Sequence, residues 1–252
     1  MQITFLGTGT SHGIPVIACD CSTCRSNNPK NKRNRTSIYV ETAGYHILID
    51  TPPEMRLELL KNNIKEVDLI LMTHAHADHL MGFDDIRALN WYQGKEMPVY
   101  ANSDTISHIK RVFPYIFAKN NPGGGVPQVI LRESKSKIKL ANLTITPIPI
   151  YHGNNLILGY RIGKFAYLTD CSKIPAASYP LLDGVEYAAV DALRYREHPT
   201  HMNVEQAVNL IKKLQLKHGY LTHLSHRLEH ERLSNSLPDN ISVAYDNLVI
   251  NI

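Results

Sequence analysis

Three histidines and an aspartate fall within six positions, directly after the short apolar run Leu69–Met72. They are His74, His76, Asp78 and His79. Imidazole and carboxylate groups together form a donor set that suits Zn²⁺, Mn²⁺ and iron. In an extended backbone the first two histidines project to the same side and can share one ion. The last two ligands follow as the chain turns toward a helix, so they can reach a second ion. The chain must therefore fold so that further ligands meet this strand end.

Two metal ions need more ligands than these four, and three further candidates each follow an apolar run that is typical of a strand. They are His152, Asp170 and His223. Loops at strand ends gather at one edge of a sheet, so these side chains can reach the histidine motif. The sequence therefore predicts a dinuclear metal site. Solvated or purely structural histidines are the alternative, and the combination of motif and strand ends disfavours it.

Short runs rich in Val, Ile, Leu, Tyr and Thr predict strands along the whole chain. The expected strands are Gln2–Leu6, Ser37–Glu41, Tyr45–Ile49, Leu69–Met72, Val99–Tyr100, Leu143–Ile150, Ile157–Ile162, Phe165–Leu168, Tyr187–Val190, Gly219–Thr222, Ile241–Ala244 and Leu248–Ile250. The expected helices are Glu54–Asn62, Phe83–Leu89, Asp104–Val112 and Val204–Leu214, the last with a capping box from Asn203 to Gln206. This uneven mixture favours stacked sheets with helices outside. Without a linker or a repeat, residues 1–252 are expected to form one domain.

Composition excludes several classes of protein. Hydrophobic residues make up 43% and charged residues 20%, which excludes a disordered or fibrous chain. No apolar stretch is long enough to span a membrane, and the first residues lack the pattern of a secretory signal. The net charge of +4 comes without a dense basic stripe, although the run Lys30–Arg35 is the best argument for an RNA partner. We expect a cytoplasmic protein without a membrane partner.

Three of the four cysteines crowd into one short loop near residues 19–24. Cys19, Cys21 and Cys24 are too close together to staple distant parts of a fold, and a reducing compartment keeps them as thiols. A closed zinc site needs one more ligand, for which His226 is suitable. We therefore predict a structural Zn²⁺ that ties this loop to the wall of the metal site. Unliganded thiols and a redox switch are the alternatives.

The histidine and aspartate pattern resembles the signature of the metallo-β-lactamase superfamily. That resemblance implies an α+β fold, a four-layer αββα sandwich with two divalent metal ions at one edge of the stacked sheets. In the family pattern one ion is bound by His74, His76 and His152, the other by Asp78, His79 and His223, and Asp170 bridges the two. Zn²⁺ and Mn²⁺ both fit this donor set. We expect Asp78 to be a catalytic residue as well as a metal ligand.

A narrower resemblance rests on residues 5–10, on the cysteine loop and on residues 221–226. These segments are similar to the phosphoribosyl cyclic phosphodiesterases of the carbon–phosphorus lyase pathway. The similarity implies a phosphodiesterase with an additional Cys₃His zinc, a small phosphorylated substrate such as a phosphoribosyl cyclic phosphate, and a homodimer. It also places His201 at the position of a catalytic histidine that protonates the leaving oxygen. A histidine at the helix entry without a chemical role is the alternative.

Other features of the sequence leave alternatives open. Asp50 and Asp191, at strand ends, are expected to orient ligand histidines. Arg194 and Arg196 could clamp a second phosphate, or they could be solvated. Residues 113–128, rich in proline and glycine, have no regular period and predict either a lid or an inert surface loop.

Two other activities compete with phosphodiester hydrolysis. A nuclease that processes tRNA 3′ ends shares the histidine motif, but the basic, glycine-rich insertion that such enzymes use is not found in this sequence. Lactone or thioester hydrolysis on the same metals is a weaker alternative. A non-catalytic metal scaffold is disfavoured because a full ligand set and a spare histidine, His201, are both present. The sequence therefore predicts a metal-dependent hydrolase.

Overall fold

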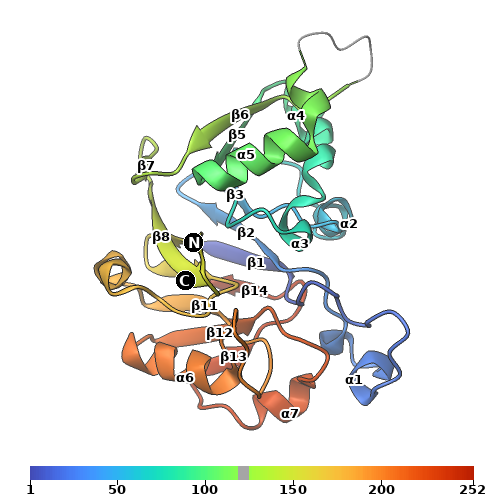
Figure 1. Cartoon of the computed structure of the whole chain (residues 1–252), viewed down its shortest axis with the longest axis vertical. Coiled ribbons are helices and arrows are strands. Elements are labelled where there is room, and N and C mark those ends of the chain that lie inside the picture. The colour runs from blue at the N-terminus through green and yellow to red at the C-terminus, as the bar shows by residue number, and fades with distance from the viewer. Residues whose placement is uncertain (119–124) are drawn as a thin grey trace.

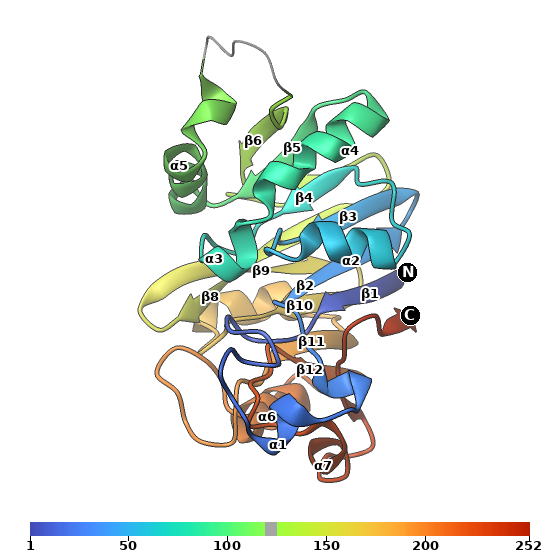
Figure 2. The same cartoon turned by 90° about the vertical axis from the view of Figure 1, so that its right-hand side faces the viewer.

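Two β-sheets packed face to face form the centre of the protein, and helices cover both outer faces (Figures 1 and 2). The computed structural model describes residues 1–118 and 125–252. Within these residues each sheet has seven strands. The two ends of the chain lie side by side, because the first strand pairs with the last.

The first sheet is built mainly from the N-terminal half of the chain. In spatial order it contains β14 (Val249–Asn251), β1 (Gln2–Gly7), β2 (Ser37–Thr42), β3 (Tyr45–Ile49), β4 (Leu69–Leu71), β5 (Met97–Ala101) and β6 (Val129–Glu133). Neighbours from β14 to β3 are antiparallel, and those from β3 to β6 are parallel. The outer face is covered by α2 (Met55–Lys61), α4 (Ile86–Gln93) and α5 (Ser103–Val112).

The second sheet is built from the C-terminal half. In spatial order it contains β13 (Ile241–Val243), β12 (His218–Thr222), β11 (Tyr187–Asp191), β10 (Phe165–Leu168), β9 (Asn155–Ile162), β8 (Thr144–His152) and β7 (Ile138–Lys139). Strands β10 to β13 are parallel, whereas β7 to β10 pair as antiparallel neighbours. The helices α6 (Val204–Lys213) and α7 (His230–Ser234) lie outside this sheet, and α1 (Ser22–Arg25) lies in the N-terminal loop nearby.

Three apolar layers hold these four layers of secondary structure together. In β3, Ile47 and Ile49 point into the core between the sheets, while Leu48 packs under the helices on the other side. This period of two, with both faces buried, is what a strand in the middle of such a sandwich requires. On the other sheet, Ile211 of α6 packs directly onto β12, where a side chain at Gly219 would leave no room. The predicted four-layer αββα sandwich is therefore confirmed.

The main elements agree with the sequence prediction, and the short ones do not. The capping box at Asn203 is present, with α6 beginning at the next residue. The helix predicted over Phe83–Leu89 is wrong in its bounds, because a 3₁₀ turn at Phe83–Asp85 precedes α4. The helices α1, α3 (Ala77–Leu80) and α7, and strands β6 and β7, are too short or too polar to show a clear period.

The predicted lid over residues 113–128 falls partly outside the described residues. Of this segment, Pro114–Phe117 forms a 3₁₀ turn after α5, and residues 119–124 are not described. The lid prediction therefore stays a prediction. None of the described helices is both long and apolar enough to cross a membrane.

Candidate active site

All seven predicted ligands of the dinuclear site lie near strand ends that meet at one edge of the sandwich. The ligands are His74 and His76 after β4, Asp78 and His79 in α3, His152 at the end of β8, Asp170 after β10, and His223 after β12. In Figure 2, α3 and the hairpin of β8 and β9 lie at this edge. Segments that are far apart in sequence therefore bring their side chains into one cluster.

The backbone bends sharply where several of these side chains leave their strands. Asp50, Asp170 and His223 have positive φ angles of 67°, 53° and 57°, so each adopts the left-handed conformation within two residues of the end of a strand. For a residue with a side chain this conformation costs about 1–2 kcal/mol. Such strain persists only where the surrounding structure determines it, and it gathers at functional sites.

Asp170 is shared between two groups of potential ligands. His74, His76 and His152 form one group with it, and Asp78, His79 and His223 form the other; within each group the ligand atoms lie within 4.8 Å of one another. Asp170 Oδ2 is 3.8 Å from His74 Nε2, whereas its Oδ1 is 3.2 Å from His79 Nε2 and 3.3 Å from His223 Nε2. One carboxylate thus faces both groups, as a bridging ligand would.

Unpaired nitrogen atoms test whether metal ions fit this cluster. Within the described residues, the Nε2 atoms of His74, His79 and His223 are buried and have no hydrogen-bond partner. A buried polar atom without a partner costs about 1–3 kcal/mol, and a cation between these nitrogens would satisfy it. His76, by contrast, is exposed to the pocket beside the cluster. The donor set therefore fits two divalent cations.

Charge in the cluster also favours a cation. Burial opposes ionisation of His79, but Asp170, Asp50 and Asp78 together raise its pKa well above the usual range. Burial lowers the pKa of His74, and the neighbouring His79 lowers it further. Burial likewise opposes the charge of Asp170, yet His223 and His79 hold its pKa well below the usual range. The surrounding carboxylates thus favour a positive charge at this position, which a metal ion would supply.

Hydrogen bonds behind the cluster set the tautomers of two ligands. His79 Nδ1 donates to Asp50 Oδ2 over 2.7 Å. The Thr73 hydroxyl donates to the same oxygen over 2.8 Å and accepts from His74 Nδ1 over 3.0 Å. Each bond places the proton on Nδ1 and leaves the Nε2 lone pair for the cluster. Sequence reasoning expected this kind of contact for Asp50 but missed Thr73, although Thr73 directly precedes the motif.

His152 is oriented by the backbone. Its Nδ1 lies 3.0 Å from the carbonyl oxygen of Asp170 and 2.9 Å from that of Thr200. A carbonyl can only accept, so Nδ1 carries the proton and Nε2 is left as the ligand atom. The same tautomer therefore holds for ligands from both sheets.

His201 lies beside the cluster and outside both groups of ligands that share Asp170. Its Nδ1 is 2.8 Å from Asp191 Oδ2, and its ring stacks on that of His223 with centroids 4.8 Å apart. The other oxygen of Asp191 is 3.7 Å from His223 Nδ1, so this carboxylate contacts both imidazoles, as expected. Burial lowers the pKa of His201. His201 thus lies next to the cluster, and the hydrogen bond from its Nδ1 to Asp191 fixes the orientation of its ring.

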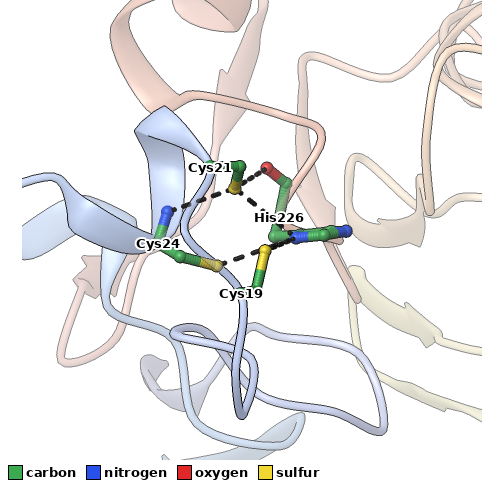
Figure 3. A group of neighbouring side chains, drawn as sticks. All are labelled: Cys19, Cys21, Cys24 and His226. Carbon is green, nitrogen blue, oxygen red and sulfur yellow. Dashed lines mark hydrogen bonds between the residues drawn. The ribbon is translucent and has the colours of Figure 1, made fainter.

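The cysteine loop reaches the chain segment that follows His223 (Figure 3). The thiol sulfurs of Cys19, Cys21 and Cys24 lie 3.2, 3.5 and 3.7 Å from His226 Nδ1. All three thiols are free of disulfides. Three sulfurs that converge with one nitrogen match the donor set of a closed tetrahedral zinc site.

Two pockets flank the cluster of potential metal ligands. The larger has a volume of about 630 Å³ and extends from the ligand histidines to His108 and Arg111 of α5. The smaller, of about 290 Å³, lies on the side of His201 and includes Arg194 and Arg227. Sequence reasoning missed Arg227, which carries no motif of its own. A substrate bound at the cluster can therefore extend to either side.

A family model described as a β-lactamase superfamily domain matches residues 45–224. The chain belongs to this superfamily. Within the β-lactamase superfamily, a crystal structure described as a new diphosphatase from the PhnP family is 42% identical, with a TM-score of 0.92 over 100% of this chain and 97% of the other. At that similarity the chain also belongs to the PhnP family.

Curated relatives carry other names. An octanoyltransferase of Porphyromonas gingivalis is 40% identical over 98% of this chain and 51% of its own length. A ribonuclease Z of Bradyrhizobium diazoefficiens is 26% identical over 63% of this chain and 48% of its own length. The chain thus spans about half the length of these curated relatives. Human tRNase Z, short form, shares the fold, with a TM-score of 0.71 and 19% identity over 100% of this chain and 99% of the other.

Proposed function

We propose that this β-lactamase-superfamily hydrolase cleaves small phosphodiesters, with phosphoribosyl cyclic phosphates as the class to test first. The observation that carries the proposal is the sharing of Asp170 between two groups of ligands, because hydrolysis of phosphate esters commonly uses a pair of metal ions. Two kinds of relative have names that refer to the cleavage of phosphate linkages: the PhnP-family diphosphatase and the ribonucleases Z. Both support a phosphorus centre as the point of attack.

The two groups that share Asp170 would each hold one divalent cation, Zn²⁺ or Mn²⁺, and the three cysteines with His226 would hold a structural Zn²⁺. When bound, the cation pair supplies an activated water and offsets the charge that develops on the phosphoryl oxygens. Seven side chains from both sheets then fix where the phosphate can lie.

The chain itself contributes the proton for the leaving group. His201 Nδ1 donates to Asp191, so the imidazolium form of His201 can give its Nε2 proton to the departing oxygen and remain as the neutral Nδ1–H tautomer. The contact with His223 places this imidazole directly beside the cluster. His201 is therefore the proposed general acid. Asp78 is proposed as a ligand that lies near the reacting phosphate.

The test is hydrolysis of bis(p-nitrophenyl) phosphate and of ribose cyclic phosphates by protein loaded with Mn²⁺ or Zn²⁺. Asp170→Asn should lose nearly all turnover, because both groups lose their shared ligand. Asp183→Asn is the matched control and should keep the native turnover, because this exposed carboxylate lies just before β11, directly after the 3₁₀ turn Ala176–Leu182. A metal-loaded protein that cleaves neither substrate would refute the proposal.

The rival activity on tRNA receives little support from the surface. In the basic run that argued for RNA, Arg33 is 1% exposed and donates to the carbonyls of Ser225 and Leu228. Lys32 bonds to a carbonyl of the cysteine loop, and Arg35 pairs with Glu54. Lys32, Arg33 and Arg35 therefore make contacts within the protein that stabilise its fold. Cleavage of precursor tRNA in the same assay would instead favour the rival.

The other expectations remain predictions. A homodimer, a cytoplasmic location and a single domain over the whole chain are each open to direct measurement. This chain spans about half of the relative that is named an octanoyltransferase, so we do not propose that activity for this chain.

A further inference from the structure

Four buried hydroxyl groups form a chain of hydrogen bonds behind the cluster. This hydroxyl chain joins both halves of the protein and consists of Thr36 directly before β2, Tyr167 in β10, Thr169 directly after β10, and Thr222 at the end of β12. All four residues are 0% exposed. Two of them directly precede proposed metal ligands, because Asp170 follows Thr169 and His223 follows Thr222. The hydroxyl chain therefore connects two strand ends that carry ligands.

One end of the hydroxyl chain is fixed by the carboxylate that both groups of ligands share. Thr169 Oγ1 donates to Asp170 Oδ1 over 2.8 Å. A hydroxyl has a single proton, so Thr169 must act as the acceptor in its hydrogen bond with Tyr167. The phenol of Tyr167 thus donates toward Asp170 through one intervening hydroxyl.

Thr36 brings the first sheet into the hydroxyl chain. Its Oγ1 lies 3.2 Å from Tyr167 Oη, 3.2 Å from Thr222 Oγ1, and 3.3 Å from the carbonyl oxygen of Gly7. The carbonyl can only accept, and Tyr167 has already given its proton to Thr169. Thr36 therefore shares its proton between these two acceptors, and it accepts from Thr222. Donors aligned toward one carboxylate strengthen one another in a buried site.

The core does not need these hydroxyl groups for its stability. Burying a hydroxyl costs free energy unless it is hydrogen-bonded, and replacing two bonded partners with apolar groups of the same shape is often nearly neutral. Phenylalanine and valine have such shapes and would fill the positions of Tyr167 and the three threonines. The connection to Asp170 therefore gives the hydroxyl chain a role other than packing.

We infer that Thr36 and Tyr167 are positioning residues, which act through the hydroxyl chain to hold Asp170 in place before the metal ions bind. The inference rests on the proposed function, because it takes Asp170 as the ligand shared by two cations. A carboxylate that already faces both groups of ligands loses less freedom on binding, so the metal affinity is higher. Because Asp170 is shared, the effect extends to both ions.

Mn²⁺ affinity measures this role without turnover. Protein stripped of exchangeable metal is titrated with Mn²⁺, and the electron paramagnetic resonance signal of the free ion gives the amount bound. Thr169→Val, which removes the donor to Asp170, should weaken the binding of both ions about 10–100-fold. Tyr167→Phe and Thr36→Val, which each remove one more distant hydroxyl, should weaken it about 3–10-fold. Thr169→Ser and Thr36→Ser, which keep the hydroxyl, should bind Mn²⁺ as the native protein does.

The matched control is Tyr39→Phe. Tyr39 is also buried, and its hydroxyl donates over 2.9 Å to the carbonyl of Glu66, which precedes β4, whereas the histidine motif follows that strand. Tyr39→Phe should lower the thermal midpoint about as much as Tyr167→Phe does and leave the Mn²⁺ affinity unchanged.

Two results would overturn the inference. One is native Mn²⁺ affinity in Tyr167→Phe or in Thr36→Val, and the other is an equal loss of affinity in Tyr39→Phe, which would indicate general loosening of the core. The proposed function fails separately. A native protein that binds two Mn²⁺ ions, shows the expected differences between variants and hydrolyses no phosphodiester would overturn the proposed substrate class and support the positioning role.

Discussion

Asp50→Asn should reverse the tautomers of His74 and His79, two of the proposed metal ligands, with one nearly isosteric change. Asp50 Oδ1 accepts from the backbone N–H of Thr73 over 2.8 Å, so the amide oxygen of an asparagine must take that place. Its NH₂ group then occupies the position of Oδ2 and donates both to His79 Nδ1 and to the Thr73 hydroxyl. Because Thr73 now accepts, its own proton turns toward His74 Nδ1. His74 and His79 must then carry their protons on Nε2, the atom that would bind metal.

The expected loss is large and affects both groups of ligands. Losing the orienting partner of a ligand typically weakens metal binding about 10–100-fold, or about 1.4–2.7 kcal/mol for each site. Thr73→Val is the matched control, since it removes the acceptor of His74 and one donor to Asp50 but leaves the contact between Asp50 and His79 in place. It should weaken one ion and spare the other.

The assay is equilibrium dialysis against buffered Mn²⁺, followed by elemental analysis. At a free Mn²⁺ concentration where the native protein holds two ions, Asp50→Asn should hold none and Thr73→Val one. The zinc content is the internal standard, because the proposed zinc site at the three cysteines and His226 is separate and should stay filled in every variant. Native Mn²⁺ affinity in Asp50→Asn, or equal loss of both ions in Thr73→Val, would show that the tautomer argument is wrong.

His201→Ala should lower turnover of a phosphodiester about 10²–10⁴-fold while metal content is unchanged; loss of metal in elemental analysis would make it a ligand instead. Gly219→Ala should destabilise the protein by about 1–3 kcal/mol in urea unfolding, because the new Cβ would lie 2.4 Å from Ile211 Cδ1; an unchanged midpoint would contradict this. Asn203→Ala should cost about 1 kcal/mol in the same experiment through loss of the helix cap, and Asn203→Ser should restore most of it. Burial raises the pKa of Cys24 to about 11, so this thiol must release its proton when zinc binds, and zinc affinity should rise with pH as long as the pH is below about 11; a flat profile would argue against thiolate ligation.

Local sequence patterns determined much of the fold because both faces of each central strand are buried. In β3 three successive apolar residues serve two different cores, and such a run is visible without any tertiary information. The capping box at Asn203 is equally local, since its partners are three residues apart. The short helices α1, α3 and α7 were missed because one turn gives no period to detect.

The sequence by itself determined which side chains gather at the cluster, because imidazole and carboxylate groups at strand ends have few other reasons to be there. Only the tertiary structure decided what surrounds them. Arg33 belongs to a run that looks like a surface patch, yet it is buried beneath the loop that carries His226. Arg227 has no motif, yet it faces the pocket beside His201. The physical reason is that a ligand is marked by its own chemistry, whereas the partner of a charge is set by chain segments that are close only after folding.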